Sequence, residues 1–391
     1  MSFKYPLATS SWDDTEIAAI KRVISSDHYS MGREVSLFEE QFARYFGSRF
    51  AVMVNSGSSA NLIMTAALFY TKFGDFKLER GDEIIVPAVS WSTTYYPLAQ
   101  YGLRLKFVDI DLQTLNYDLT ALNAAITENT RAVMIVNLLG NPNEFDKISE
   151  VIKDRNIILL EDNCESMGAA FDGKYTGTHG LLGSFSCFFS HHISTMEGGV
   201  IVTDDEELYH IMLSLRAHGW TRNLPKNNFV TGEKSDDKFT ESFRFVLPGY
   251  NVRPLEMSGA IGQEQLKKLD SIIQGRRENG RKFVEMFSDN ENIIIQKEIG
   301  ASSWFGFSMI VKDPAKLTRS QLVRLLSENG FECRPIVSGN FAKNEVMRHF
   351  SYSVSGKLNN AEYLDLNGLF IGNHHYDMEE AFDKLKQLLD Y

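Results

Sequence analysis

The stretch that decides the fold is "FAVMVNSGSSANLIMTAALFY", residues 50–70. Its first five residues form an apolar run of strand length, and the apolar residues after the turn "NSGSSAN" extend over a helical length. Small residues between a strand and a helix let the backbone approach a ligand, and a helix N-terminus offers free N–H groups to a phosphate. A serine N-cap would give the same pattern. The stretch therefore predicts a strand, a turn and a helix, and the turn fits either a phosphate site or a plain N-cap.

The same alternation continues along the first half of the chain. Helical patterns at 120–129 and 143–155 separate apolar runs of strand length, each of which ends in a polar or glycine-containing turn. These runs are "DEIIVPAVSW" (82–91), "LKFVDID" (105–111), "RAVMIVNLLGN" (131–141) and "NIILLEDNCESMGA" (156–169). The pattern predicts an α/β fold with a mainly parallel sheet covered by helices on both faces. Ligands bind beyond the carboxyl ends of such strands, so polar residues there are the candidates.

The pattern changes after Gly249. A long helical stretch at 253–287 leads into strand and helix patterns of an α+β unit, which ends in the helix "MEEAFDKLKQLLDY". We predict a large domain at 1–260 and a smaller C-terminal α+β domain at 261–391. The polar stretch at 223–242 predicts a long surface excursion, and loops of that length are often functional.

Composition excludes several classes of protein. The 391 residues are 43% apolar and 23% charged, enough for a sizeable core, and the net charge of -11 argues against nucleic-acid binding. There is no signal-peptide pattern and no apolar run of membrane-spanning length. Cys164, Cys187 and Cys333 are scattered and form neither a disulfide framework nor a CxxC metal pair. We expect a cytoplasmic enzyme without a metal site.

Three side chains at strand ends suit a planar, charged cofactor. Trp91 follows an apolar strand and can stack on a ring, although a core tryptophan fits the same pattern. Asp162 ends a strongly apolar strand, and Glu165 comes three residues later. A carboxylate there can pair with a pyridinium nitrogen, which is how pyridoxal phosphate (PLP) is held as an electron sink. Helix capping is the alternative for both carboxylates.

Five motifs occur in a specific order: "SGSSAN", an aromatic after "VPAVS", an "ED" strand end, "SF…EGG" and "GYNVRP". In this order the chain resembles the PLP-dependent sugar aminotransferase family, of fold type I in the aspartate aminotransferase superfamily, over nearly its whole length. The resemblance implies a homodimer with active sites at the subunit interface and a nucleotide-linked keto sugar as substrate. By resemblance, Gly57, Ser58 and Ser186 hold the phosphate, Trp91 stacks on the ring and Asp162 pairs with the pyridine nitrogen.

The remaining candidates also rest on matched segments. Asn251 would reach the phosphate of the partner subunit, and Glu165 would accept a hydrogen bond from the cofactor's hydroxyl side. Arg222 and Arg253 suit a diphosphate or the carboxylates of glutamate, and Glu332 suits sugar hydroxyls or guanine. Surface salt bridging is the alternative for these last three residues.

The chain departs from the family at one position. In the family, a lysine forms a Schiff base with PLP and also moves a proton. This lysine lies five residues after the phosphate-binding serine, here Ser186, and six residues before the Glu of "EGG", here Glu197. Both counts reach His191. An imidazole forms no stable imine, so PLP would bind non-covalently, but a neutral imidazole can still move a proton. His192 is the alternative base, and adjacent side chains diverge, which disfavours a metal site from the pair.

A histidine at position 191 that can move a proton but forms no covalent link to PLP predicts dehydration rather than amine transfer. The substitution resembles two subgroups of sugar 3-dehydratases, one of which carries an iron–sulfur cluster needing four cysteines that this chain does not supply. The other uses PLP, pyridoxamine phosphate (PMP) and glutamate on GDP-4-keto-6-deoxy-D-mannose, and segments such as "SHHISTMEGG" (190–199) match it. It implies GDP-4-keto-3,6-dideoxymannose, ammonia and 2-oxoglutarate as products, on a route to a colitose-type O-antigen sugar. The alternatives are a nucleotide-sugar aminotransferase with an unrecognised lysine, a 3-dehydratase of another nucleotide sugar, and a non-catalytic relative.

Overall fold

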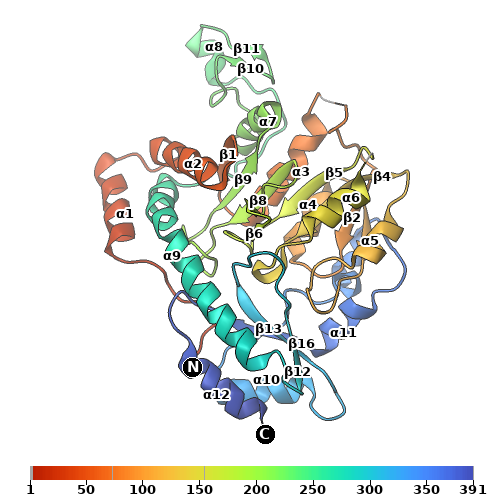
Figure 1. The fold of residues 1–391 in the computed structure, drawn as a ribbon. Coiled ribbons are helices and arrows are strands. Elements are labelled where there is room, and N and C mark those ends of the chain that lie inside the picture. Colours follow the sequence, from red (N-terminus) through yellow and green to blue (C-terminus); the bar gives the residue numbers. More distant parts are fainter. Residues whose placement is uncertain (1–2, 73, 154, 391) are drawn as a thin grey trace.

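The large sheet of the protein has eight strands in the order β1-β9-β8-β5-β4-β2-β3-β15 (Figure 1). The structure is a computed structural model and describes residues 3–72, 74–153 and 155–390. Neighbouring strands are parallel except for the two pairs that β9 makes with β1 and β8. The predicted mainly parallel, mixed sheet is therefore confirmed. The strands are β1 (Phe50–Val54), β9 (Gly199–Thr203), β8 (Leu182–Ser186), β5 (Ile158–Asp162), β4 (Thr130–Val136), β2 (Glu83–Pro87), β3 (Arg104–Val108) and β15 (Tyr352–Val354).

Helices cover both faces of this sheet because its strands are apolar on both sides. In β4, Ala132 and Met134 pack into the core on one face, and Val133 and Ile135 pack into the core on the other. The first face carries α3 (Gly57–Tyr70), α4 (Ser92–Gln100) and α7 (Glu206–Arg216). The second carries α2 (Arg33–Phe46), α5 (Leu119–Ala125), α6 (Phe145–Ile152) and the first half of α9 (Glu256–Phe287), against which α1 (Asp14–Ser26) also packs.

The C-terminal part forms a smaller α+β unit. Its antiparallel sheet has the order β12-β13-β16-β14 and shares a core with the second half of α9. The elements are β12 (Ile293–Ile295), β13 (Gly306–Val311), α10 (Arg319–Glu328), β14 (Cys333–Arg334), α11 (Asn359–Asn367), β16 (Gly368–Gly372) and α12 (Glu379–Leu389). The predicted boundary at residue 260 lies inside the unbroken helix α9, and β15 returns to the large sheet. The division at residue 260 stays a prediction.

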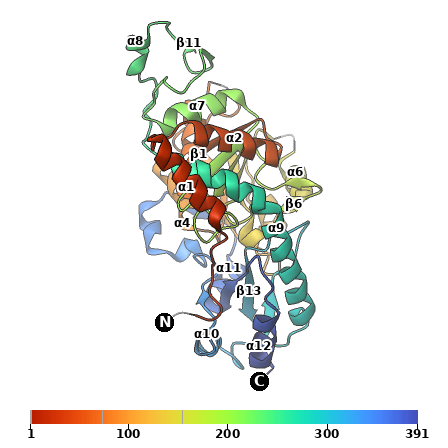
Figure 2. The same cartoon turned by 90° about the vertical axis from the view of Figure 1, so that its left-hand side faces the viewer.

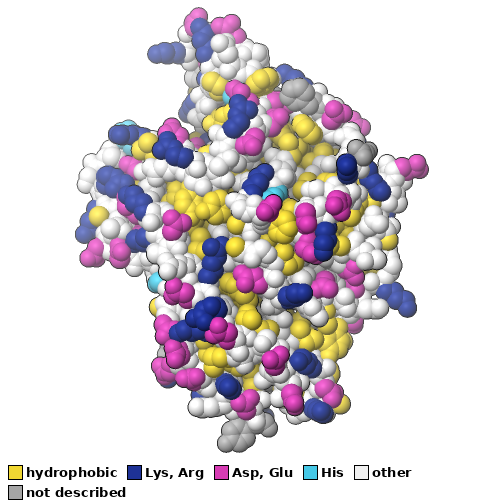
Figure 3. All heavy atoms as spheres, viewed as in Figure 1, with side chains coloured by type: hydrophobic (Ala, Val, Ile, Leu, Met, Phe, Trp, Pro, Cys, Tyr) yellow, Lys and Arg dark blue, Asp and Glu magenta, His cyan; other side chains and the backbone are white. Residues whose placement is uncertain are grey.

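An arm formed by residues 223–246 projects from the body at the end opposite both termini (Figures 1 and 2). It contains β10 (Asn227–Asn228), β11 (Gly232–Glu233) and α8 (Lys238–Ser242). Phe239 and Phe243 on the arm are 89% and 68% exposed, far more than is usual for aromatic side chains. On the face shown in Figure 3, acidic and basic side chains are interspersed. None of the helices in the described part of the chain combines the length and apolar character needed to span a bilayer.

Candidate active site

A cavity of about 800 Å³ lies where the strands of the large sheet end, and the smaller unit closes part of it. Strands β1, β5 and β8 run in the same direction, so the residues that follow them meet at one edge. Eight of the eleven predicted site residues line this cavity: Gly57, Ser58, Trp91, Asp162, Glu165, Ser186, His191 and Glu332. The structure thus brings these eight side chains together, and their individual roles stay predictions.

The turn between β1 and α3 is a cradle for an anion. Ser56 is the N-cap of α3, and its hydroxyl accepts a hydrogen bond from Ser59 N at 3.1 Å. A Cβ on Gly57 would lie 2.8 Å from Ser186 Cβ and 3.0 Å from Cys164 Sγ, so only glycine fits without displacement. Gly57 therefore lets the first turn of α3 lie close to the Ser186 side chain, and the N–H groups of a first helical turn suit an anion. The sequence left the N-cap and the phosphate site as alternatives. They are compatible, because Ser56 forms the N-cap and the predicted phosphate residues are Gly57, Ser58 and Ser186.

Asp162 lies on the floor of the cavity and is held by three donors. Asn61 Nδ2 and Thr94 Oγ1 donate to its Oδ2 at 2.8 and 2.7 Å, and Cys164 N donates to Oδ1 at 3.2 Å. Sequence reasoning missed Asn61 and Thr94. Two sequence features could have indicated them: Asn61 is a polar residue in a mainly apolar helical stretch, and Thr94 lies shortly after the candidate stacking residue Trp91. The three donors fix the carboxylate so that it can face a cationic ring nitrogen.

Trp91 stands at the rim of the cavity rather than in the core. It precedes α4, and 57% of its surface is exposed. The alternative of a core tryptophan is therefore wrong. Phe188 and Phe189 also line the cavity and are 42% and 49% exposed, so the mouth is markedly aromatic. Such rings offer flat surfaces for stacking.

Glu165 is covered inside the cavity and is poised between its two protonation states. Leu139 N, in the single 3-10 turn η1 (Leu138–Gly140), donates to its Oε2 at 3.0 Å, so Glu165 holds the start of a short turn that precedes it by 26 residues. Burial raises the pKa of Glu165 to about 7, the Leu139 N–H opposes the rise, and the nearby Asp162 carboxylate adds to it. A carboxyl with this pKa can donate or accept a proton near neutral pH.

The two histidines point to different places. His191 lines the cavity, and its ring lies 5.1 Å from the Phe305 ring and 6.0 Å from the Phe188 ring, measured between centroids. Burial, with a smaller effect from the Arg276 guanidinium, lowers the pKa of His191 to about 4, so its imidazole is neutral at physiological pH. His192 is buried outside the cavity lining, and its Nε2 lies 3.1 Å from Ser303 O, to which it donates.

Three predicted residues lie outside the cavity of their own chain. The Arg222 and Arg253 guanidinium carbons lie 4.3 and 5.7 Å from the Trp220 ring centroid, at the base of the arm. Arg253 Nε donates to Asn251 Oδ1 at 3.0 Å. These residues form one cluster that the structure does not bring to the eight cavity residues. A partner-subunit role for Asn251 requires this placement, and its role stays a prediction.

The cavity carries more negative than positive charge. Its lining carboxylates are Asp162, Glu165, Glu197 and Glu332, and Arg334 is the only lysine or arginine among the described residues that line it. Glu332 accepts from Leu7 N at 3.0 Å and from Arg334 Nη2 at 2.8 Å. Sequence reasoning missed Arg334, because nothing in "ECRPIV" separates it from surface arginines. In the described ranges, no group of three or more His, Cys, Asp or Glu side chains is placed to hold a metal ion.

Comparison with known proteins identifies the family that shares this arrangement. A model of the DegT/DnrJ/EryC1/StrS aminotransferase family matches residues 10–384. The chain belongs to this family. The resemblance on which the roles of Gly57, Asp162 and the other site residues were predicted is therefore confirmed, while the individual roles stay predictions.

One relative and two solved structures are especially similar to the chain. GDP-4-keto-6-deoxy-D-mannose 3-dehydratase of Escherichia coli O55:H7 is 62% identical over 386 residues, which cover 98% of this chain and 99% of the relative. The E. coli enzyme solved with hydrated PLP has 61% identity, full coverage of both chains and a TM-score of 0.98. A structure of GDP-4-keto-6-deoxymannose-3-dehydratase with a trapped PLP–glutamate geminal diamine has 61% identity, coverage of 99% and 100%, and a TM-score of 0.97. The shared fold confirms the predicted PLP fold type I.

Within this DegT/DnrJ/EryC1/StrS frame, position 191 is the distinctive one. The family lysine is expected there, and the structure places a neutral histidine in the cavity wall. No lysine is among the described residues that line the cavity. The site can therefore move a proton at this position but offers no amine for a covalent link to a carbonyl.

Proposed function

We propose that this protein is a PLP- and PMP-dependent nucleotide-sugar 3-dehydratase that removes the C3 hydroxyl of GDP-4-keto-6-deoxy-D-mannose. The observation that carries the proposal is His191, a neutral base in the cavity wall at the position of the family lysine. The 62% identity to an enzyme named for this reaction supports the choice of substrate. The product is GDP-4-keto-3,6-dideoxymannose.

The residues present fit PLP. Gly57, Ser58 and Ser186 form the cradle that a Cβ would fill, and they suit a phosphate. Asp162, anchored by three donors, suits a protonated pyridine nitrogen, and Trp91 offers its exposed face to the ring. When bound, PLP supplies an electron sink and, as PMP, the amino group that activates the C4 position of the sugar.

The chain's own groups then have separate tasks. His191 accepts a proton and returns it, because its uncharged ring nitrogen is available over the whole physiological pH range. Glu165 meets the hydroxyl side of the cofactor as hydrogen-bond acceptor or donor, according to its protonation state. Phe188 and Phe305 pack beside His191 and would shield part of its ring from solvent.

We propose glutamate as the amino donor and co-substrate. Replacing a C–OH group by C–H is a two-electron reduction, and oxidation of glutamate to 2-oxoglutarate and ammonia supplies those two electrons. The relative with a trapped PLP–glutamate adduct supports this donor. Arg334, the lining cation, suits one of its carboxylates.

We also propose that the active unit is a homodimer whose partner completes the site. GDP, the PLP phosphate and glutamate are all anionic, whereas the lining of one chain has four carboxylates and one arginine. The cluster of Asn251, Arg222 and Arg253 stands apart, next to an arm with exposed aromatic side chains. Docking of the arm of one subunit over the aromatic mouth of the other would supply the missing positive charge.

Mixing two inactive variants tests this arrangement. A His191→Asn subunit paired with an Arg253→Gln subunit has one site with both defects and one intact site. If Arg253 acts across the interface, an equimolar mixture re-dimerised from monomers recovers about a quarter of wild-type activity, because half the dimers are mixed. Activity of the mixture no higher than that of the separate variants would place Arg253 elsewhere.

One incubation tests the reaction itself. Enzyme, PLP, glutamate and GDP-4-keto-6-deoxy-D-mannose should yield ammonia, 2-oxoglutarate and a 3-deoxy product. A stable 4-amino sugar would instead identify an aminotransferase. Borohydride reduction of the PLP-loaded protein should leave every lysine unmodified, and a phosphopyridoxyl-lysine would refute the role of His191. We further propose a cytoplasmic place in the synthesis of a colitose-type O-antigen sugar, since GDP-linked deoxysugars of this kind are its precursors.

A further inference from the structure

Arg276 is a buried cation directly behind the cavity wall. It lies on α9, is 6% exposed, and its Nη1 donates to Phe305 O at 3.0 Å and Trp304 O at 3.4 Å. Phe305 is the residue whose ring contacts both histidines, at 5.1 Å from His191 and 5.9 Å from His192. Arg276 therefore reaches the catalytic position through one intervening side chain.

The charge of Arg276 is not neutralised by a carboxylate. Among the described residues, no Asp or Glu oxygen lies within 4.0 Å of its guanidinium nitrogens, and its Nε has no hydrogen-bond partner. Burial lowers the pKa of Arg276 to about 10, which leaves it charged at neutral pH. A buried, unpaired charge is costly to a fold, so a useful effect on its surroundings is expected to offset that cost.

The backbone that Arg276 holds is strained. Trp304 has a φ of 46°, in the left-handed region that bulky residues rarely adopt. Its carbonyl accepts from Arg276 and, at 2.8 Å, from Asn373 Nδ2. These donors keep the segment 303–305 against the histidines, and this geometry sets the position of the Phe305 ring.

Resting on the proposed function of His191, we propose that Arg276 is a positioning residue: its hydrogen bonds keep Phe305 packed against the His191 ring, and its charge adds to burial in keeping that imidazole uncharged. A cation held in a poorly solvated wall disfavours a second positive charge nearby far more than it would in water. The uncharged base is then available at every pH at which the enzyme works.

Other charges also face His191 and act in both directions. Arg276 lies behind the ring and disfavours its protonation, whereas burial lowers the pKa of the neighbouring His192 and leaves that imidazole uncharged. The groups across the open cavity are the carboxylates of Asp162, Glu165, Glu197 and Glu332, the Cys164 thiol and the Arg334 guanidinium. The carboxylates would attract a proton to His191, so removal of Arg276 leaves their effect unopposed from behind.

Direct titration of His191 in the cofactor-free protein tests the proposal without using activity. NMR of protein labelled with 13C-histidine reports each imidazole, and the His191→Asn variant identifies the signal of His191. We expect a pKa near 4 in the unmutated protein, a rise of about one pH unit in Arg276→Met, and little change in Arg276→Lys, which keeps the charge. The acid limb of the kcat profile should move by the same amount.

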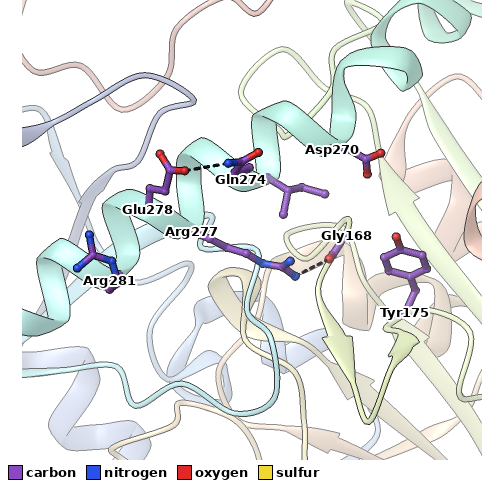
Figure 4. A pocket seen from close by; sticks show the side chains of 8 residues that line it. Gly168, Tyr175, Asp270, Gln274, Arg277, Glu278 and Arg281 are labelled. Carbon is purple, nitrogen blue, oxygen red and sulfur yellow. Dashed lines mark hydrogen bonds between the residues drawn. The ribbon is translucent and has the colours of Figure 1, made fainter.

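Arg277 provides a matched control on the same helix. It donates to Ser302 O at 2.8 Å and to Gly168 O at 3.1 Å, so it holds neighbouring backbone. Figure 4 shows it extending toward Gly168 in a separate pocket of about 360 Å³, beside the hairpin of β6 (Ala170–Phe171) and β7 (Lys174–Tyr175). Arg277→Met should destabilise the protein to a similar degree and leave the His191 titration unchanged.

Three results would overturn the proposal. One is an ordinary His191 pKa of about 6.5 in the unmutated protein, which needs no variant. The second is an unchanged His191 pKa in Arg276→Met, and the third is an equal rise in Arg277→Met. Should Arg276→Met fail to fold, Arg276→Gln takes its place, because glutamine keeps an N–H donor but carries no charge, and an unchanged His191 pKa in that variant would overturn the proposal. An enzyme with another substrate would still give the predicted titration, so the two proposals fail separately.

Discussion

Replacing Glu165 by glutamine should make the cofactor-free protein more stable at alkaline pH. Burial raises the pKa of Glu165 from its ordinary 4.5 to about 7 in the folded protein. For a group whose folded-state pKa is raised, the associated stability is complete below the unfolded-state pKa and is lost as the pH rises through the folded-state pKa. Wild-type protein therefore loses this stability between about pH 4.5 and 7, whereas glutamine does not titrate.

The magnitude follows from the size of the pKa displacement. At 1.36 kcal/mol per pKa unit, it corresponds to about 3 kcal/mol in the free energy of unfolding, of which roughly 2 kcal/mol is lost between pH 5 and pH 8.5. Glutamine has nearly the same shape, and its carbonyl oxygen can accept the hydrogen bond that Leu139 N donates at 3.0 Å. The substitution should therefore remove the ionisation cost without leaving an unpaired donor.

Urea unfolding of both proteins at pH 5 and pH 8.5, in the absence of PLP, measures the effect. The stability difference in favour of Glu165→Gln should grow by roughly 2 kcal/mol between the two pH values. Glu197→Gln is the matched control, because Glu197 lines the same cavity but is exposed to solvent. A difference for Glu165→Gln that stays constant with pH, or one that Glu197→Gln reproduces, would refute the burial of this carboxyl as the cause.

Three further outcomes are expected. Gly57→Ala places a methyl group 2.8 Å from Ser186 Cβ, so PLP affinity in a fluorescence titration should fall about tenfold or more, whereas Gly74→Ala, in open space, should leave it unchanged. His191→Lys should gain a covalent link to the cofactor, seen as a mass increase after borohydride reduction, and lose dehydration; an unchanged rate would place the base elsewhere. Arg334→Gln should raise the KM for glutamate about tenfold, because Arg334 is the lining cation that suits a glutamate carboxylate. Supplying PMP in place of PLP and glutamate should restore a single turnover of the variant. An unaltered KM would show that Arg334 does not bind the amino donor.

The parts of the fold that the sequence predicted are those specified by local pattern. The strands β1, β2, β4 and β5 are continuous apolar runs because helices bury both of their faces, and each ends at a turn visible in the sequence. Strand β15 was not anticipated. It is three exposed residues long, pairs with β3 at the edge of the sheet, and nothing in "YSV" indicates that pairing. Edge pairing is decided by tertiary packing rather than by local preference.

The same distinction divides the site. Asp162 and Ser186 were found because they end buried strands, and His191 was found by counting from two motifs. Asn61 and Thr94 were missed because they reach Asp162 only when α3 and α4 pack over β5. Phe305 was missed for the same reason: it is brought to His191 by the smaller unit, and the residues next to it in the sequence give no sign of that contact.

Under the proposed function, the exchange of lysine for histidine is tolerable because other groups of the cavity can hold the cofactor without a covalent link. In the proposed function, the cradle at Gly57, the fixed carboxylate of Asp162 and the exposed ring of Trp91 would act on three different parts of PLP, and they come from three different strand ends. On this proposal, loss of the link would lower the affinity for PLP and leave its orientation intact, and the neutral ring of His191 would keep the proton transfer. Without an amine in the wall, no lysine competes for the activated sugar, so loss of the C3 hydroxyl and hydrolysis can proceed before the amino group is transferred. On this proposal, one side chain would change the outcome of the reaction while the rest of the aminotransferase site is retained.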